Sequence, residues 1–160
     1  MERRNFFKVG AALVAAAVAP RMVMAEDFRQ TKPKAWTVKN DDKSKKPSMK
    51  GTEDAIKQLF GTNETIDGKV SLKAPAIAEN GAVVPITIKT KLPATQIAVF
   101  QSANPEATVA VFDVHKNSIP NYSIRIKMKK TGYVTVVAKA DGKLYTTKKL
   151  VKVTIGGCGG

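Results

Sequence analysis

The sequence has few of the residues that build catalytic, metal-binding and disulfide-linked sites. Its 160 residues include one cysteine, one histidine and one tryptophan, and aromatic residues make up 6%. The single cysteine, Cys158, cannot form a disulfide within the chain, and no cluster of further ligands suggests a metal site. The single histidine, His115, has no carboxylate or second ligand nearby in the sequence to support acid–base catalysis or metal binding. We therefore expect no catalytic residues, no metal site and no enzymatic activity.

Long apolar runs are also missing. The apolar run at residues 9–20 has twelve residues, whereas a bilayer-spanning helix needs about 20. It follows a basic start with Arg3 and Arg4 and precedes a small-residue end at Ala25, which is typical of a secretory signal peptide. We expect residues 1–25 to be a twin-arginine signal that directs the protein to the periplasm, with an ordinary secretory signal as the alternative. No membrane span is predicted.

Acidic residues are scarce relative to basic ones. The chain has 13 acidic and 27 basic residues and a formal charge of +14. Without residues 1–25, 23 basic and 12 acidic residues remain, and the charge is +11. Such an excess favours encounter with anionic partners, surfaces or small anions. Nucleic acid is not expected, because the few aromatic residues are not interleaved with basic ones as on a single-strand binding surface.

The mature chain is predicted to begin with a lysine-rich leader, residues 26–50. Seven lysines lie between Lys32 and Lys50, and such charge runs are usually solvated, so we expect loose packing. A lysine tether for an acidic partner is the alternative. The next stretch, "TEDAIKQLFG", predicts a short amphipathic helix with Thr52 as its N-cap and Gly61 at its end.

The rest of the domain, up to residue 155, is predicted to be all β. Short β-rich segments bounded by turn residues occupy residues 69–73, 82–90, 95–101, 107–114, 122–128, 133–140 and 143–155. Asp141-Gly142 predicts a tight hairpin, and Pro85 predicts an edge strand or a bulge. This number of strands fits an immunoglobulin-like antiparallel β-sandwich, with a small barrel as the alternative.

The last strand leads directly into the cysteine. Val151, Val153 and Ile155 are predicted to face inward, after which the chain ends in "GGCGG". We expect residues 156–160 to form a flexible arm, because glycine adds little steric restriction or buried surface. Three extended residues place Cys158 about 10 Å beyond the sheet. The thiol could be presented to other proteins' active sites, or it could form an intermolecular disulfide; the residues alone leave both interpretations open.

Together, the twin-arginine signal, the β domain and the terminal "GGCGG" resemble the SoxY family, the sulfur carriers of the thiosulfate-oxidising (Sox) system. The resemblance extends over about residues 52–160 and includes "AIKQLFG" and "ENGAVVPITI". It implies a carrier without a cofactor, in which Cys158 holds sulfur intermediates covalently. The resemblance also implies that the glycines form its arm, namely Gly156, Gly157, Gly159 and Gly160.

The same resemblance implies several protein partners. One is a SoxZ-like β-sandwich subunit, with which the carrier forms a heterodimer. The visiting enzymes are a c-type cytochrome sulfur transferase, a di-manganese hydrolase that releases sulfate and, where the pathway includes it, a sulfur dehydrogenase. The other hypothesis is an exported β-sandwich interaction module whose terminal cysteine forms a permanent bridge to a second protein.

Overall fold

The computed structural model describes residues 33–40, 46–115 and 117–156, all of which belong to a single compact unit, residues 32–160. The signal expected in residues 1–25 lies outside the described residues. The described helices and strands are α2 (Lys34–Thr37), α3 (Lys50–Phe60), β1 (Ile66–Asp67), β2 (Val70–Lys73), β3 (Ile77–Asn80), β4 (Val84–Thr90), β5 (Ala94–Gln101), β6 (Thr108–Asp113), β7 (Asn121–Ile126), β8 (Gly132–Ala140) and β9 (Lys143–Ile155).

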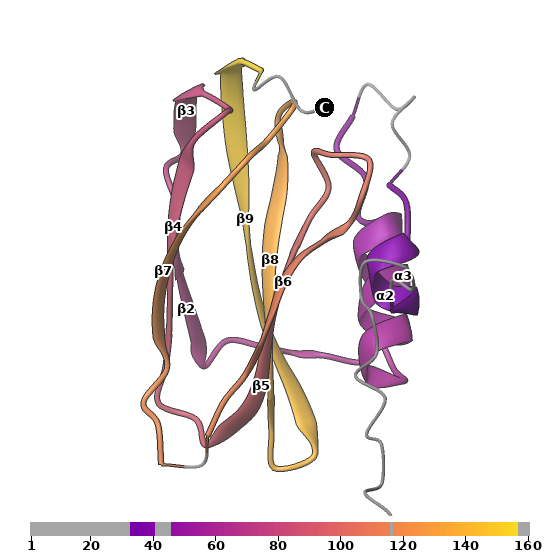
Figure 1. Cartoon of the computed structure of the whole chain (residues 1–160), viewed down its shortest axis with the longest axis vertical. Coiled ribbons are helices and arrows are strands. Elements are labelled where there is room, and N and C mark those ends of the chain that lie inside the picture. Colours follow the sequence, from indigo (N-terminus) through magenta and orange to yellow (C-terminus); the bar gives the residue numbers. More distant parts are fainter. Residues whose placement is uncertain (1–32, 41–45, 116, 157–160) are drawn as a thin grey trace, which may run out of the picture. The chain divides into compact units, whose positions relative to one another are not determined.

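The described strands form two facing sheets (Figure 1). The larger sheet has the order β1-β9-β8-β5-β6, with β3 also paired to β9, and the smaller sheet has the order β2-β4-β7. This confirms the predicted β-sandwich. The short strands β1 and β3 pair with β9 in parallel, whereas the other described pairs are antiparallel. The sandwich is therefore antiparallel except along the outer edge of β9.

The main hydrophobic core fills the space between the two sheets. Ile86 and Ile88 of β4 face Ile97, Val99 and other buried residues of the larger sheet. On β7, Ile126 is buried while its neighbours Arg125 and Lys127 are exposed. This alternation is typical of a strand with one buried face and one solvent-exposed face.

A second hydrophobic cluster lies on the opposite face of the larger sheet, beneath α3. Ala55 and Ile56 of the helix pack against Ala98, Phe100 and Val137. The central strands of this sheet are therefore buried on both faces, which explains why their sequences are almost continuously apolar. Figure 1 shows the resulting order of layers: the smaller sheet, the larger sheet and the helices.

Helix α3 begins earlier than predicted. It starts at Lys50, with Met49 at the N-cap position and no side-chain cap hydrogen bond. Thr52, the predicted N-cap, lies inside the helix, and its side chain is completely buried with an unpaired hydroxyl. The N-cap prediction is wrong because the helix is extended by a turn that packs against the preceding chain. The predicted end at Gly61 is confirmed by its left-handed conformation, with φ of 82°.

Part of the lysine-rich leader is packed rather than loose. The buried hydroxyl of Thr108 donates to the carbonyl of Ala35 at 2.6 Å. The side-chain amide of Asn40 donates to the carbonyls of Gln101 and Asn104, both at 2.8 Å. Hydrogen bonds from side chains to backbone carbonyls thus hold residues 33–40 along β5 and β6. The prediction of loose packing is wrong for these residues. It was based on their high lysine content, which does not show that they hydrogen-bond to residues far away in the sequence.

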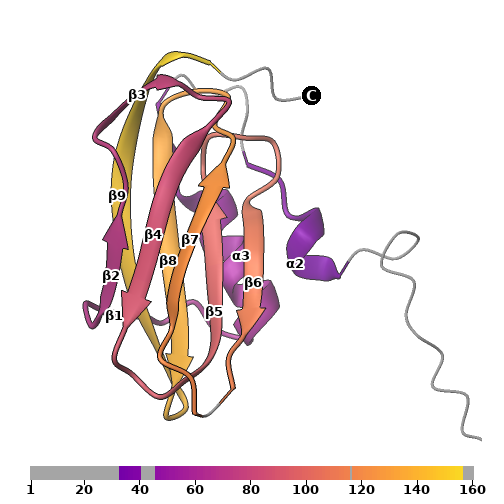
Figure 2. The same ribbon diagram turned by 60° about the vertical axis from the view of Figure 1, so that its left-hand side comes forward.

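The prediction for Pro85 is wrong in one respect, since β4 is the central strand of the smaller sheet, between β2 and β7 (Figure 2). Its pairing with β2 runs only from Thr87 to Thr90, whereas its pairing with β7 includes Pro85 opposite Arg125. Proline lacks the amide hydrogen that a second neighbouring strand would require. Pro85 is therefore tolerated on a central strand because β2 does not extend alongside it.

The predicted hairpin between β8 and β9 is confirmed. Asp141 and Gly142 both have positive φ angles, 51° and 71°. This combination matches the twist of two antiparallel strands joined by two residues. In the described part of the chain, no helix is both long and apolar enough to cross a membrane.

Candidate functional site

The residues that were predicted to form the site are only partly described by the structure. Cys158 and its neighbours Gly157, Gly159 and Gly160 lie outside the described residues. Gly156 and the strand that precedes it are described. The structure therefore shows Ile155 and Gly156, which we call the root of the predicted arm.

Strand β9 is held in the sheet up to its final residue. Asn80 of β3 is paired with Ile155, and the amide of Gly81 donates to the carbonyl of Ile155 at 2.9 Å. Just before this point, the amide of Val153 donates to the hydroxyl of Thr131 at 3.0 Å. These contacts confirm the predicted extent of the last strand, which stays in the sheet up to residue 155.

Gly156 extends the anchored part of the chain by one residue. A Cβ atom placed on it would overlap the backbone carbonyl oxygen of Lys129. The loop that carries this carbonyl is itself fixed, because the Lys129 amide donates to Asn104 Oδ1 at 2.8 Å. The amide of the preceding residue, Met128, donates to the carbonyl of Gly81 at 2.7 Å. Glycine is therefore required here for close backbone approach, which differs from the flexibility predicted for all the arm glycines.

The predicted inward orientation of the last β9 side chain is wrong. Val151 is completely buried and Val153 is half-buried, but Ile155 is 70% exposed. Ile77 and Val83 are also exposed on the segment that runs along this end of β9. The alternation fails at Ile155 because the strand extends past the hydrophobic core, where no facing sheet covers it.

The sequence analysis missed β3, the strand that fixes the root. Its sequence, Ile77–Asn80, contains only one β-branched residue and follows Pro75. It lacks the alternating pattern that predicts a strand. The only signal in the sequence was Asn80-Gly81, a turn pair directly before the predicted strand that became β4.

The described residues contain no group of three or more histidine, cysteine, aspartate or glutamate side chains placed to hold a metal ion. His115 lies exposed in the loop after β6, where its Nδ1 accepts a hydrogen bond from the amide of Asn117 at 3.4 Å. His115 is therefore a solvent-exposed loop residue. The chemically distinctive feature of the described structure is thus the anchored root that leads to Cys158.

Comparison with known proteins gives a strong structural match. The sulfur carrier protein SoxY from Chlorobium limicola f thiosulfatophilum is 44% identical, with a TM-score of 0.62 over 68% of this chain and 100% of that chain. A superoxide reductase (neelaredoxin) from Ignicoccus hospitalis is 12% identical, with a TM-score of 0.48 over 53% of this chain and 79% of that chain. The latter is too distant to bear on function. No curated protein matches the sequence significantly.

A family model adds independent support. The model described as sulfur oxidation protein SoxY matches residues 56–158, from within α3 to the terminal cysteine. This match covers most of the β-sandwich together with the root at Gly156 and reaches Cys158 itself. The chain therefore belongs to the SoxY family.

Proposed function

We propose that this protein carries sulfur intermediates of thiosulfate oxidation covalently on Cys158 and presents them to partner enzymes. The observation that carries the proposal is the match to the SoxY family up to residue 158, combined with the rigid root at Gly156. A short segment that starts from a fixed point can place a thiol repeatedly at the same distance from the domain. Glycines around Cys158 keep that segment narrow.

Loading requires an oxidation that this chain does not perform. The Cys158 thiol loses its proton, and its sulfur forms a new bond to the sulfane sulfur of thiosulfate. Two electrons are released, and they pass to the c-type cytochrome partner, which is the oxidant in this step. In this proposal the protein's own contribution is to hold and position the sulfur.

Release of sulfate is a hydrolysis in the proposed sequence. Water attacks the terminal sulfonate sulfur, the sulfur–sulfur bond to that group breaks, and sulfate and two protons are released. The carrier then holds a persulfide anion on Cys158. The di-manganese hydrolase partner supplies the catalysis, and a sulfur dehydrogenase, where present, oxidises the remaining sulfane sulfur.

We further propose that the protein acts in the periplasm after twin-arginine export and forms a heterodimer with a SoxZ-like subunit. The motivation for export is the Arg3-Arg4 start followed by a short apolar run. The motivation for a partner is the pair of open edge strands, β2 and β7, in the described smaller sheet. Periplasmic fractionation with an Arg3→Lys, Arg4→Lys variant tests export, and light scattering with the purified subunit tests the heterodimer.

Intact mass under native, non-reducing conditions distinguishes the carrier from the alternative, an interaction module bridged through Cys158. Protein isolated from cells oxidising thiosulfate is expected to carry sulfur-containing adducts that disappear on reduction and in Cys158→Ser. A stoichiometric covalent dimer that resists mild reduction would contradict the carrier function and support the bridge.

A further inference from the structure

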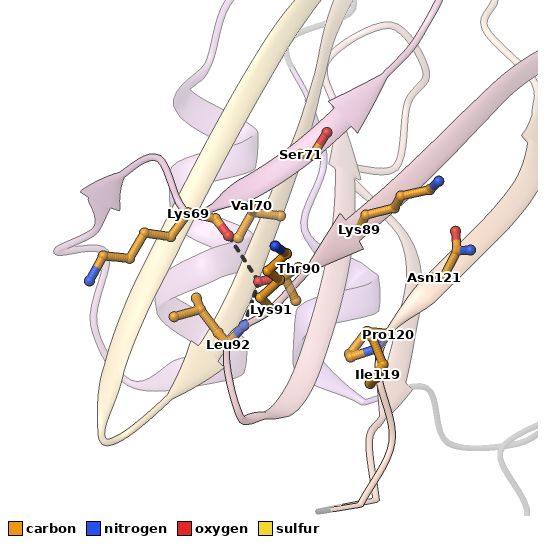
Figure 3. Close-up of a pocket in the computed structure, with 10 residues that line it drawn as sticks. All are labelled: Lys69, Val70, Ser71, Lys89, Thr90, Lys91, Leu92, Ile119, Pro120 and Asn121. Atoms are coloured by element: carbon orange, nitrogen blue, oxygen red, sulfur yellow. Dashed lines mark hydrogen bonds between the residues drawn. The ribbon is translucent and has the colours of Figure 1, made fainter.

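A groove lies at the end of the sandwich opposite Gly156. It has a volume of about 840 Å³ and is formed by the start of β2, the end of β4 with the loop after it, and the residues just before β7. Lys69, Leu92 and Ile119 mark these three parts of its wall (Figure 3). The proposed sulfur chemistry makes no use of this groove, because Figure 1 shows the last described residues of β9 at the other end of the sheets.

The groove is held open by one buried side chain, Thr90, which is 5% exposed. Its hydroxyl donates to the carbonyl of Lys69 at 2.9 Å and accepts the amide of Leu92 at 3.1 Å (Figure 3). Its backbone amide donates to the carbonyl of Pro120 at 3.4 Å. Thr90 thus joins all three parts of the wall, so the groove exists before any partner binds.

The lining of the groove combines apolar surface with positive charge. Leu92 is half-buried, whereas Ile119 is 85% exposed although it is a large aliphatic residue. Lys89 and Lys91 are exposed, and neither forms an ion pair with another described residue. Lys69 lies over the ring of Tyr145 at 5.1 Å. The described lining residues include no aspartate or glutamate.

A polar cleft of about 410 Å³ continues from the groove across the outer face of the smaller sheet. It shares Lys89 with the groove and adds Lys73 and two hydroxyl side chains. These hydroxyls, Thr87 Oγ1 and Ser123 Oγ, lie 3.0 Å apart. The strands β2, β4 and β7 contain no acidic residue. The whole face therefore offers hydrogen-bond donors and positive charge next to an apolar hollow.

We propose that this combined surface, the groove and the outer face of β2-β4-β7, binds an acidic segment of a partner protein. An apolar side chain of that segment occupies the hollow beside Ile119 and Leu92. Its carboxylates lie over Lys73, Lys89 and Lys91. Such an arrangement uses apolar contact for affinity and opposite charge for steering and selectivity. Because the groove lies at the end of the sheets opposite Gly156, a segment seated in it leaves the root of the cysteine arm uncovered.

A protein partner fits this surface better than an anionic membrane or a nucleic acid. A bilayer surface is flat and cannot fill a concave groove, and Ile119 is the one strongly exposed aliphatic side chain among the described lining residues. Single-stranded nucleic acids stack on aromatic rings, and the described lining has none. A protruding apolar side chain flanked by carboxylates satisfies both the shape and the charge.

The test uses the full mature chain, labelled with ¹⁵N, and a short synthetic peptide in which glutamates flank one phenylalanine. We expect the peptide to shift the amide resonances of Lys69, Thr90 and Leu92, and its affinity to fall at about 1 M salt, where the Debye length is about 3 Å. Replacing its phenylalanine by serine should weaken binding about tenfold or more.

Variants separate local contact from net charge. Lys89→Glu should weaken peptide binding about fivefold. Lys57→Glu changes the charge equally but lies on α3, on the far side of the larger sheet, and should leave binding nearly unchanged. Cys158→Ser should bind the peptide normally, so this test is independent of the sulfur-carrier function.

Several outcomes would overturn the proposal. They are undetectable peptide binding, resonance shifts confined to other surfaces, and equal weakening by Lys57→Glu. Stronger shifts of the same amides with phosphatidylglycerol vesicles or with a single-stranded oligonucleotide would assign the surface to a membrane or a nucleic acid instead.

Discussion

Gly156 lies against the backbone carbonyl of Lys129 so closely that no side chain fits between them. The Lys129 amide is held by Asn104 and the neighbouring Met128 amide by Gly81, so this carbonyl cannot easily move away. The glycine is therefore part of the folded domain. The predicted arm is thus anchored at its first residue, Gly156.

The first prediction tests this relationship with Gly156→Ala. The added methyl group forces a shift of fixed backbone, and overpacking of this kind costs about 1–3 kcal/mol. Thermal unfolding should therefore begin at a lower temperature. Gly157→Ala is the matched control and should leave the midpoint nearly unchanged. Equal midpoints for the two variants would contradict the anchoring of Gly156.

A second prediction concerns Thr52, whose buried hydroxyl has no hydrogen-bond partner. Thr52→Val removes this desolvated polar group with little change in volume, so we expect the free energy of unfolding to rise by about 1 kcal/mol. The N-cap role predicted from the sequence gives the opposite sign, because losing a cap costs about 1 kcal/mol. Urea unfolding of both proteins decides between the two.

A third prediction concerns the packed part of the leader. Asn40 donates to the carbonyls of Gln101 and Asn104. Asn40→Ala removes both bonds, and a buried group left without a partner costs about 1–3 kcal/mol. In the variant, the hydrogen-exchange rate should rise at the amides of residues 40 and 107. These amides donate to the carbonyls of Pro105 and Val38 and so join the leader to the sandwich. Unchanged exchange there would show that the leader is held by other contacts.

Much of the fold could be predicted because the long strands consist of β-favouring residues and are bounded by turn residues. The β-rich segments bounded by turn residues predicted a β-sandwich, and Asp141-Gly142 predicted its terminal hairpin. Strand β3 could not be predicted in this way, because Ile77–Asn80 is a strand only through its parallel pairing with the distant β9. Long-range pairing similarly determined the packing of Asn40.

The sequence indicates the chemistry of the candidate site but not the geometry at its described end. A lone cysteine among glycines is visible in the sequence, and the SoxY match extends to residue 158. The need for glycine at position 156 depends on a contact with Lys129, a residue distant in the sequence. Such a role for glycine leaves no local signal, because flexibility and close approach select the same residue.

The last prediction separates the width of the arm from its thiol. If Cys158 enters narrow channels in several enzymes, a branched side chain beside it should impede sulfur transfer even though the sulfur is intact. Gly157→Val and Gly159→Val should change the free energy of unfolding by less than about 0.5 kcal/mol, as expected for terminal substitutions that are predicted to pack against nothing. Thiosulfate-dependent electron transfer in the reconstituted system should nevertheless fall sharply.

The controls for this prediction measure folding and thiol access separately. Thermal midpoints establish that the valine variants are folded, and reaction with a small thiol reagent establishes that Cys158 remains accessible. Cys158→Ser should show no covalent loading, because a hydroxyl cannot form the sulfur–sulfur bond. If folded, reagent-accessible Gly157→Val and Gly159→Val retain full transfer, narrowness is not the reason for the glycines. A terminal cysteine that serves as an intermolecular bridge would then account for the motif better, since a disulfide to a partner needs access but no passage through a channel.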